Sequence, residues 1–307
     1  MPEVSVIIPT YQRIDKISPT ISSVLNQSFS DLEIIIVNDG EDDKSLLEIL
    51  DNFNDHRINY FRNQRKKGSN GTRNTGFHNA NGRYIAFLDD DDIWYPDKIQ
   101  KQINKFNESS KDTGVVYCGY EIISTSTDGY TINIFPHRKG NISEDIISGN
   151  FIGSPTPLIK KDLLNEAEPY DENLKSAQDW DLWIGLSVKT EFEYVDEILA
   201  KYLLHGNQIS FDYETKAESL DYIIKKYSKL YNKHRRALST IYKRIAILLF
   251  MSDRTEASRK NIIKAFLTYC FRIDLPAHLI LSFFPELYRL YIDKHFLKTL
   301  GEHKLLY

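Results

Sequence analysis

Apolar and polar residues alternate along the first 90 residues in a way that predicts strands separated by helices. Continuous apolar runs, typical of strands buried on both faces of a parallel sheet, occupy residues 4–9, 33–37 and 84–88, with a shorter run at 58–61. Between them, apolar residues recur at helical spacing over residues 14–25, 46–53 and 72–79. This order predicts a doubly wound, mostly parallel sheet of the α/β class, with its ligand crevice at the carboxyl ends of the strands.

The pattern changes after residue 94. We expect a helix to about residue 107, a strand at 114–120, a polar hairpin or flap over 121–140 and a strand at 153–159. A helix with interleaved acids and indoles begins within residues 176–183. From residue 216 to 306 the periodicity is helical, interrupted by Pro276 and Pro285. The sequence therefore predicts an α/β domain at 1–213 and a helical C-terminal region at 214–307.

Composition supports a folded globular chain. With 307 residues and 41% hydrophobic content, the chain can bury a full core. Cys118 and Cys270 lie far apart in apolar surroundings, which predicts two buried thiols in a reducing compartment. The N-terminus has no basic segment and no small-residue cleavage site, so we expect a cytoplasmic protein.

Charge is divided unevenly along the chain. Residues 215–307 hold 18 Lys and Arg against 8 Asp and Glu, a net charge of +10, whereas residues 1–214 carry a net charge of −14. A basic tail of this kind predicts an anionic partner. We favour a membrane surface over nucleic acid, because no groove-reading motif is present and the apolar clusters of the tail are shorter than the roughly 20 residues that span a bilayer.

Four consecutive aspartates, Asp89 to Asp92, directly follow the apolar run at 84–88. Like charges this close repel by about 1 to 4 kcal/mol per pair, so the run favours a divalent cation, and oxygen-only ligands suit Mg²⁺ or Mn²⁺. A solvated acidic loop is the alternative, but it would not need the apolar residues on both sides. Thr10 and Asp39 also fall at strand ends, so we expect the three strand ends to converge on one crevice.

A loop rich in glycine and cations spans residues 65–76 and opens a helix. Its backbone N–H groups and Arg73 can hold a diphosphate. A flexible, solvated loop remains the alternative.

The chain carries four motifs in order, VSVIIPTYQR at 4–13, IIIVNDG at 34–40, GTRNTGFHNANGRYIAFLDDDDIW at 71–94 and SAQDWDLW at 176–183. Together they resemble the family 2 glycosyltransferases of the GT-A fold, over about residues 3–210. The resemblance implies inverting transfer from a nucleotide-sugar, of the UDP-sugar type, to a hydroxyl of a glycan or lipid-linked saccharide. Such enzymes assemble polysaccharide, lipopolysaccharide or glycoprotein glycans, which would place this chain peripherally on the cytoplasmic face of the cell membrane.

The resemblance also implies roles for individual residues. Asp39 would contact the nucleotide base, and Asp89 and Asp91 match the D-x-D pair that holds the metal and the sugar diphosphate. His205 sits where the family places a histidine near the metal or the leaving diphosphate. Thr10, Tyr11 and Arg13 would line the same nucleotide pocket. The other residues predicted to bind the substrate are Pro9, Asp90 and the Arg73 of the glycine-rich loop.

Asp179 matches the family's general base. The usual Glu-Asp pair is Gln178-Asp179 here, a departure that affects contacts to the sugar or acceptor and keeps the base itself. Asp181 is either the next candidate for the base or a first-turn acid that complements the helix dipole.

Two rival functions come from other classes. A nucleotidyltransferase also combines an α/β sheet with acidic metal ligands, but residues 9–13 lack the glycines expected after its first strand. An inactive, membrane-associated scaffold would keep the fold without turnover.

Overall fold

The computed structural model describes residues 1–41, 43–124, 129–164, 168–204, 212–272 and 274–294. The chain divides into two compact units. The first comprises Met1–Ile142, Ile152–Glu172 and Gly185–Gly206, and the second comprises Ser143–Phe151, Asn173–Ile184 and Asn207–Tyr307. The second unit thus takes in two internal segments besides the C-terminal helices. The boundary at residue 213 stays a prediction.

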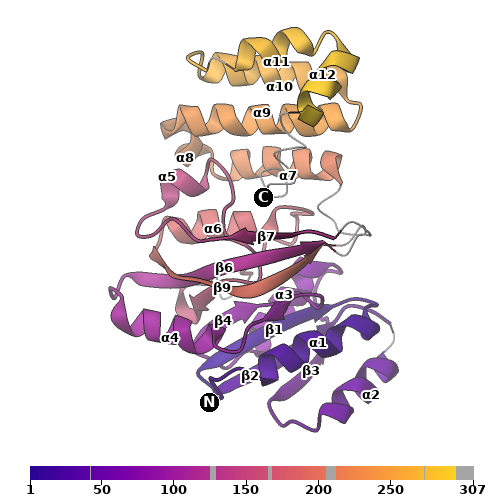
Figure 1. Ribbon diagram of the computed structural model, residues 1–307, viewed down its shortest axis with the longest axis vertical. Helices are drawn as coiled ribbons and strands as arrows, with labels where there is room; N and C mark the ends of the chain where they lie inside the picture. Colours follow the sequence, from indigo (N-terminus) through magenta and orange to yellow (C-terminus); the bar gives the residue numbers. More distant parts are fainter. Residues whose placement is uncertain (42, 125–128, 165–167, 205–211, 273, 295–307) are drawn as a thin grey trace. The chain divides into compact units, whose positions relative to one another are not determined.

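A mixed sheet forms the centre of the first unit (Figure 1). Its described strands are β1 (Val4–Thr10), β2 (Leu32–Asn38), β3 (Ile58–Arg62), β4 (Tyr84–Phe87), β5 (Ile93–Trp94), β6 (Thr113–Ser124), β7 (Thr131–Ile134), β8 (Leu158–Lys160) and β9 (Glu191–Leu204). Their order is β3-β2-β1-β4-β8-β6-β9-β5, with β7 paired to β6.

The N-terminal half of the sheet is parallel, as predicted. β1 pairs with β2 and β4, and β2 pairs with β3. Every residue of β1 and β2 is buried, which explains their continuous apolar sequences. The connecting helices are α1 (Ile14–Leu25), α2 (Asp43–Phe53) and α3 (Ser69–Asn79). α3 packs so close to β1 that a Cβ on Gly76 would lie 2.4 Å from Ile7 Cγ2.

The other half of the sheet mixes directions. β8 is antiparallel to β4 and β6, whereas β9 is parallel to β6. The strand predicted at 153–159 begins only at Leu158, because Pro155 and Pro157 have no N–H for a strand ladder. β7 and the end of β6 form the hairpin predicted within 121–140, and α4 (Lys98–Glu108) is the helix predicted after residue 94.

Helices make up most of the described second unit, which confirms the helical prediction for the tail. They are α5 (Ser143–Ile146), most of α6 (Gln178–Ser187), α7 (Tyr213–Lys226), α8 (Ser228–Lys233), α9 (Arg235–Met251), α10 (Thr255–Thr268), α11 (Leu275–Leu281) and α12 (Pro285–Ile292). Pro276 and Pro285 lie in the first turns of α11 and α12, where a missing N–H costs nothing. Across the described part of the chain, every helix is too short or too polar to cross a bilayer.

The two cysteines differ in exposure. Both are free thiols; Cys118 is buried, as predicted, but Cys270 is exposed. Burial of Cys270 was therefore a wrong prediction. Cys270 lies in the connection between α10 and α11, outside the helical faces that pack inward.

Candidate active site

The carboxyl ends of β1, β2 and β4 meet at one edge of the sheet, as parallel strands require. Thr10 ends β1, Asp39 follows β2, and Asp89 is the second residue after β4. The N–H of Asp39 donates to the carbonyl of Thr10 over 2.9 Å, and Thr10 Oγ1 donates to Asp90 Oδ2 over 2.7 Å. The predicted convergence of these strand ends is confirmed.

The four aspartates form a fixed turn with graded exposure. The side chain of Asp89 is 31% exposed, those of Asp90 and Asp91 are 5% and 7% exposed, and Asp92 is fully buried. The N–H of Asp92 donates to the carbonyl of Asp89 over 3.0 Å. Thr20 Oγ1 lies within hydrogen-bond distance of the carbonyls of Asp90 and Asp92, at 3.0 and 2.9 Å. These contacts exclude a merely solvated acidic loop.

Arg13 binds the middle of this acidic turn. Its Nη1 donates to Asp91 Oδ2 over 2.6 Å and to Asp90 Oδ1 over 3.1 Å. Burial alone would lower the pKa of Arg13, but the two carboxylates outweigh burial and raise it. Burial raises the pKa of Asp90 to about 6, a shift that the charge of Asp91 increases and the hydrogen bond from Thr10 opposes. The predicted nucleotide-pocket residue Arg13 is thus a charge partner of the acidic turn.

Asp92 has a structural role. Burial raises its pKa well above the usual range, and the charges of Asp91 and Asp89 add to the shift. Its Oδ1 accepts a hydrogen bond from the N–H of Leu203, in β9, over 3.2 Å. Asp92 therefore ties the acidic turn to β9, a contact that the sequence did not predict.

Arg73 forms an ion pair with Asp89, the most exposed of the four aspartates. Its guanidinium also lies 5.2 Å from the ring centroid of Tyr170. The structure thus places this predicted diphosphate ligand beside the acidic turn, and its contact with a diphosphate stays a prediction.

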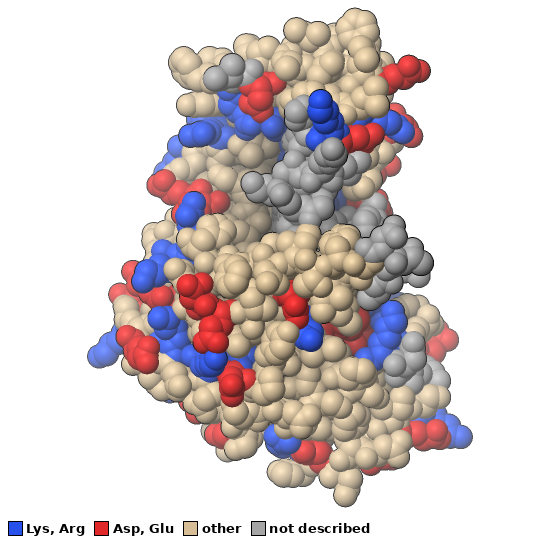
Figure 2. All heavy atoms as spheres, in the orientation of Figure 1, with Lys and Arg blue, Asp and Glu red and all other residues tan. Residues whose placement is uncertain are grey.

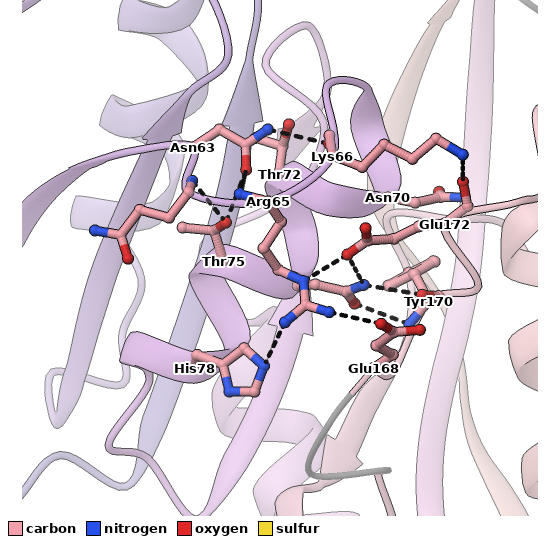
Figure 3. A network of polar contacts seen from close by, with 12 residues as sticks. Asn63, Arg65, Lys66, Asn70, Thr72, Thr75, His78, Glu168, Tyr170 and Glu172 are labelled. Atoms are coloured by element: carbon pink, nitrogen blue, oxygen red, sulfur yellow. Dashed lines mark hydrogen bonds and ion pairs between the residues drawn. The ribbon is translucent and has the colours of Figure 1, made fainter.

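A polar network holds α3 and the loop before it (Figure 3). Asn74 Nδ2 donates to the carbonyl of Tyr170 and to Glu172 Oε1, both over 2.9 Å. Arg65 Nε donates to Glu172 Oε1 over 2.5 Å, and Arg65 Nη2 donates to Glu168 Oε1 over 2.8 Å. Although burial opposes it, the bonds from Arg65 and Asn74 lower the pKa of Glu172.

This network shows that the segment over 65–76 is anchored, contrary to the flexible-loop alternative. Sequence reasoning missed residues 168–172 as its anchors. The polarity of α3 was the sequence feature that could have indicated such anchors, because a polar helix that is buried needs hydrogen-bond partners.

Asp39 fixes the same loop. Asn63 Nδ2 donates to Asp39 Oδ1 over 2.6 Å, and the N–H of Gly68 donates to Oδ2 over 2.8 Å. Its contact with a nucleotide base stays a prediction. Nearby, Tyr11 is 45% exposed and has Lys67 Nζ 5.3 Å from its ring centroid, whereas Pro9 is buried within β1.

Asp89 and Asp91 are the candidate metal ligands. Among the described residues, no group of three His, Cys, Asp or Glu side chains is arranged to hold an ion by itself. Mg²⁺ and Mn²⁺ are commonly held by one or two carboxylates, with substrate phosphates and waters completing the coordination. Two oxygen donors in an acidic turn fit an ion shared with a diphosphate. His205, the other predicted ligand, lies outside the described residues.

The predicted base lies in the second unit. Asp179 is half-buried in the first turn of α6. Asp181, two residues later, is 5% exposed and pairs with Lys226 Nζ over 2.7 Å. The buried carboxylate of Asp181 is therefore committed to an ion pair with Lys226, and Asp179 as the base stays a prediction.

Comparison with known proteins gives one family. The model of glycosyl transferase family 2 matches residues 5–165. The Escherichia coli UDP-Glc:alpha-D-GlcNAc-diphosphoundecaprenol beta-1,3-glucosyltransferase WfgD is 31% identical over 209 residues, covering 67% of this chain and 79% of that protein. An uncharacterised glycosyltransferase of Rickettsia typhi is 34% identical over 211 residues, or 67% of this chain. This chain spans 65% of that protein, less than two thirds of its length.

Solved structures share the fold. Staphylococcus aureus TarS 1–349 in complex with UDP-GlcNAc superposes with a TM-score of 0.66 at 16% identity, covering 94% of this chain and 90% of that one. The mannosyltransferase PcManGT of Pyrobaculum calidifontis, in complex with GDP-Man and Mn²⁺, gives a TM-score of 0.61 at 14% identity, covering 94% and 82%. These likenesses confirm the predicted GT-A fold.

Proposed function

The chain belongs to glycosyl transferase family 2, and from this premise we propose that it transfers a sugar from a nucleotide-sugar, of the UDP-sugar class, to a hydroxyl of a glycan or lipid-linked saccharide. The observation that carries the proposal is the acidic turn at the strand ends, fixed by Thr10 and Arg13. Displacing a nucleoside diphosphate requires positive charge at the leaving group and a base for the acceptor hydroxyl.

In the proposed reaction the acceptor oxygen attacks the anomeric carbon on the face opposite the diphosphate. A carbon–oxygen bond forms, the bond to the diphosphate breaks, and configuration inverts. Asp179 takes the hydroxyl proton as general base, while Tyr11 and Asp39 hold the nucleoside. A Mn²⁺ or Mg²⁺ ion held by Asp89 and Asp91 would supply positive charge to the leaving diphosphate. The GDP-Man and Mn²⁺ bound by PcManGT support this assignment.

A lipid-linked acceptor is supported by the name of WfgD, whose acceptor is a diphosphoundecaprenol-linked sugar. Such an acceptor lies at a membrane, so we also propose a peripheral membrane partner. The net charge of the tail gives this partner only weak support. Lys226 and Lys243 are paired with Asp181 and Asp274, and Arg244 is buried, so part of the tail's positive charge is taken up within the protein itself.

Apolar surface offers a better basis for membrane binding. Large apolar side chains of α10 to α12 and their connections are between 36% and 81% exposed, and in Figure 2 the surface over these helices carries few charges. They are Ile263, Phe266, Leu267, Phe271, Ile280, Phe283, Phe284, Leu287 and Leu290. A concentration of this kind marks a surface that binds a partner, and the exposed Lys264 beside it favours an anionic bilayer.

Flotation with vesicles of phosphatidylglycerol and phosphatidylcholine tests the membrane partner. Leu267→Asp and Phe271→Asp should lose binding, whereas Val188→Asp, which changes an exposed apolar residue of the first unit, should keep it. Equal flotation of all three variants would exclude this surface. A change from dimer to monomer in sedimentation, without loss of flotation, would assign it to a second copy of the chain instead.

Release of nucleoside diphosphate tests the transfer activity. UDP-glucose, UDP-GlcNAc and GDP-mannose are incubated with the full chain, with and without Mn²⁺ or Mg²⁺. The proposal predicts metal-dependent release of UDP from one of the UDP-sugars. Release of pyrophosphate from a nucleoside triphosphate and a sugar phosphate would favour the nucleotidyltransferase, and no turnover of any donor would favour the scaffold.

A further inference from the structure

Trp180, next to the predicted base, is held from two sides within the second unit. Its Nε1 donates to the carbonyl of Ile146 over 2.6 Å. The guanidinium of Arg244, on α9, lies 5.5 Å from the centroid of the indole. Trp180 is 2% exposed, so its position leaves little freedom to the helix turn that carries it.

Asp181 is held through both its side chain and its backbone. Lys226 Nζ, at the end of α7, lies 2.7 Å from Asp181 Oδ2. The hydroxyl of the next residue, Tyr227, donates to the carbonyl of Asp181 over 2.9 Å. Two successive residues of the C-terminal region therefore hold one residue of the first turn of α6.

The turn that these contacts hold contains an unfavourable backbone conformation. Ala177 has a φ of +59°, in the left-handed region that residues other than glycine rarely adopt. Its carbonyl accepts the hydrogen bond from the N–H of Asp181 over 3.1 Å. Strained residues persist where their surroundings fix them. The contacts on Asp181 therefore help to hold this turn in its strained conformation.

Lys216, also on α7, lies in the same cluster. Its side chain is buried, and burial lowers its pKa to about 7; the charge of Arg244 lowers it further and that of Asp179 opposes the shift. Asp179 is thus electrostatically coupled to a buried lysine of α7. Both acids in the first turn of α6 interact with a lysine of the C-terminal region, Asp181 through an ion pair with Lys226.

We propose that Lys226 is a positioning residue for sugar transfer: through Asp181 it fixes the first turn of α6 and so the direction of the Asp179 carboxylate. This inference rests on the proposed function, in which Asp179 is the general base. It gives the C-terminal helices a part in catalysis that is separate from membrane binding. Lys226 acts through Asp181 and needs no contact with the substrate.

The test compares Lys226→Met and Lys226→Arg with Lys225→Met. Lys225 is the matched control, because it also lies on α7 and its ion pair, with Asp221, is on the exposed side of that helix. We measure amide hydrogen exchange over residues 176–184, turnover of UDP-glucose, and the Kd for that donor. Tyr227→Phe, which removes one hydroxyl, provides the same test if Lys226→Met does not fold.

In Lys226→Met, exchange over 176–184 should be faster by about 10-fold or more, because the turn loses its anchor. Turnover should fall by about 10- to 100-fold, the effect of a misplaced catalytic group, with the Kd unchanged. Lys226→Arg should keep most of the wild-type protection from exchange and most of the turnover. Lys225→Met should match the wild type in both measurements.

Three results would overturn the proposal: unchanged exchange in Lys226→Met, faster exchange with full turnover, or a weakened Kd that accounts for the loss. Failure of the proposed function looks different. There, Asp179→Asn would keep full turnover, whatever the Lys226 variants do.

Discussion

Arg13 Nη1 lies 2.6 Å from Asp91 Oδ2, so the predicted metal ligand is paired with a cation of the protein. An ion that binds Asp91 must therefore compete with the guanidinium. If Asp91 holds a metal ion, Arg13 would neutralise the acidic turn when no donor is bound and would be free to approach the diphosphate once the ion takes its place.

Removing Arg13 should separate these effects. In Arg13→Ala, Mn²⁺ alone should bind about 10-fold more tightly, because one competing charge is gone, whereas UDP-glucose with Mn²⁺ should bind more weakly. Titration calorimetry measures both. Lys16→Ala, which removes an exposed cation of α1, is the control. Unchanged Mn²⁺ affinity in Arg13→Ala would show that Asp91 is not a ligand.

Asp91→Asn tests the proposed metal site by changing a ligand instead of the arginine that competes for it. Metal-dependent binding of the donor should disappear while the fold stays intact, because the substitution removes one of the two proposed ligands and relieves like-charge repulsion within the run of aspartates. Asp92→Asn is the control, because burial already favours the protonated form of that carboxyl. Calorimetry with UDP-glucose and Mn²⁺ decides the matter, and donor binding that survives in Asp91→Asn contradicts the assignment.

The network around α3 offers a paired comparison of two acids that bind one arginine. Glu172 and Glu168 both accept from Arg65, but their side chains are 14% and 49% exposed. Glu172→Gln should lower the free energy of unfolding by about 1 to 3 kcal/mol, because the partly buried, charge-assisted hydrogen bonds of Glu172 with Arg65 and Asn74 are weakened. Glu168→Gln should change it by less than about 1 kcal/mol, as for an exposed ion pair. Urea unfolding of both variants gives the comparison, and equal losses would contradict it.

His278 should make the second unit sensitive to acid. Burial lowers its pKa to about 4, the nearby charges of Lys243 and Arg272 add to the shift, and Asp274 opposes it. Its Nδ1 lies 2.9 Å from the hydroxyl of Tyr288. Because the folded pKa is below the unfolded value of about 6.5, the unfolded state binds more protons between pH 4 and 6.5.

Stability should therefore fall as the pH drops from 6.5 to 4, by at most about 3 kcal/mol, and this loss should be absent above pH 6.5. His278→Gln should flatten that part of the profile. His56→Gln, a change at a 95% exposed side chain, should leave it as in the wild type. Thermal unfolding from pH 4 to 8 measures the slopes, and parallel profiles for wild type and His278→Gln would rule out this residue.

The local pattern of apolar and polar residues was sufficient to predict the parallel half of the sheet and the place of the acidic turn. β1 and β2 are buried on both faces, so their sequences are continuous apolar runs, and the carboxyl ends of parallel strands must meet. β9 escaped prediction because its partly exposed residues mix charged and apolar types without a clear period. Pattern is informative only where one face, or both, is uniformly buried.

Partners of polar side chains could not be predicted, because they are distant in sequence. Arg13 meets Asp91 across 78 positions, and Asn74 meets Glu172 across 98. The same holds for the second unit, where Asp181 pairs with Lys226. Net charge suggested that the tail's cations face a partner, whereas tertiary contacts commit several of them to the protein.

The most direct test of the account is the turnover and donor affinity of Asp179→Asn, measured together on the nucleotide-sugar that the wild type cleaves. The substitution keeps the size and shape of the side chain and removes the proton acceptor. The account predicts that turnover falls by roughly 10² to 10⁴-fold, the usual contribution of general base catalysis, while the Kd for the donor stays within about twofold. Loss of donor binding with turnover retained at saturation would contradict it and make Asp179 a binding residue.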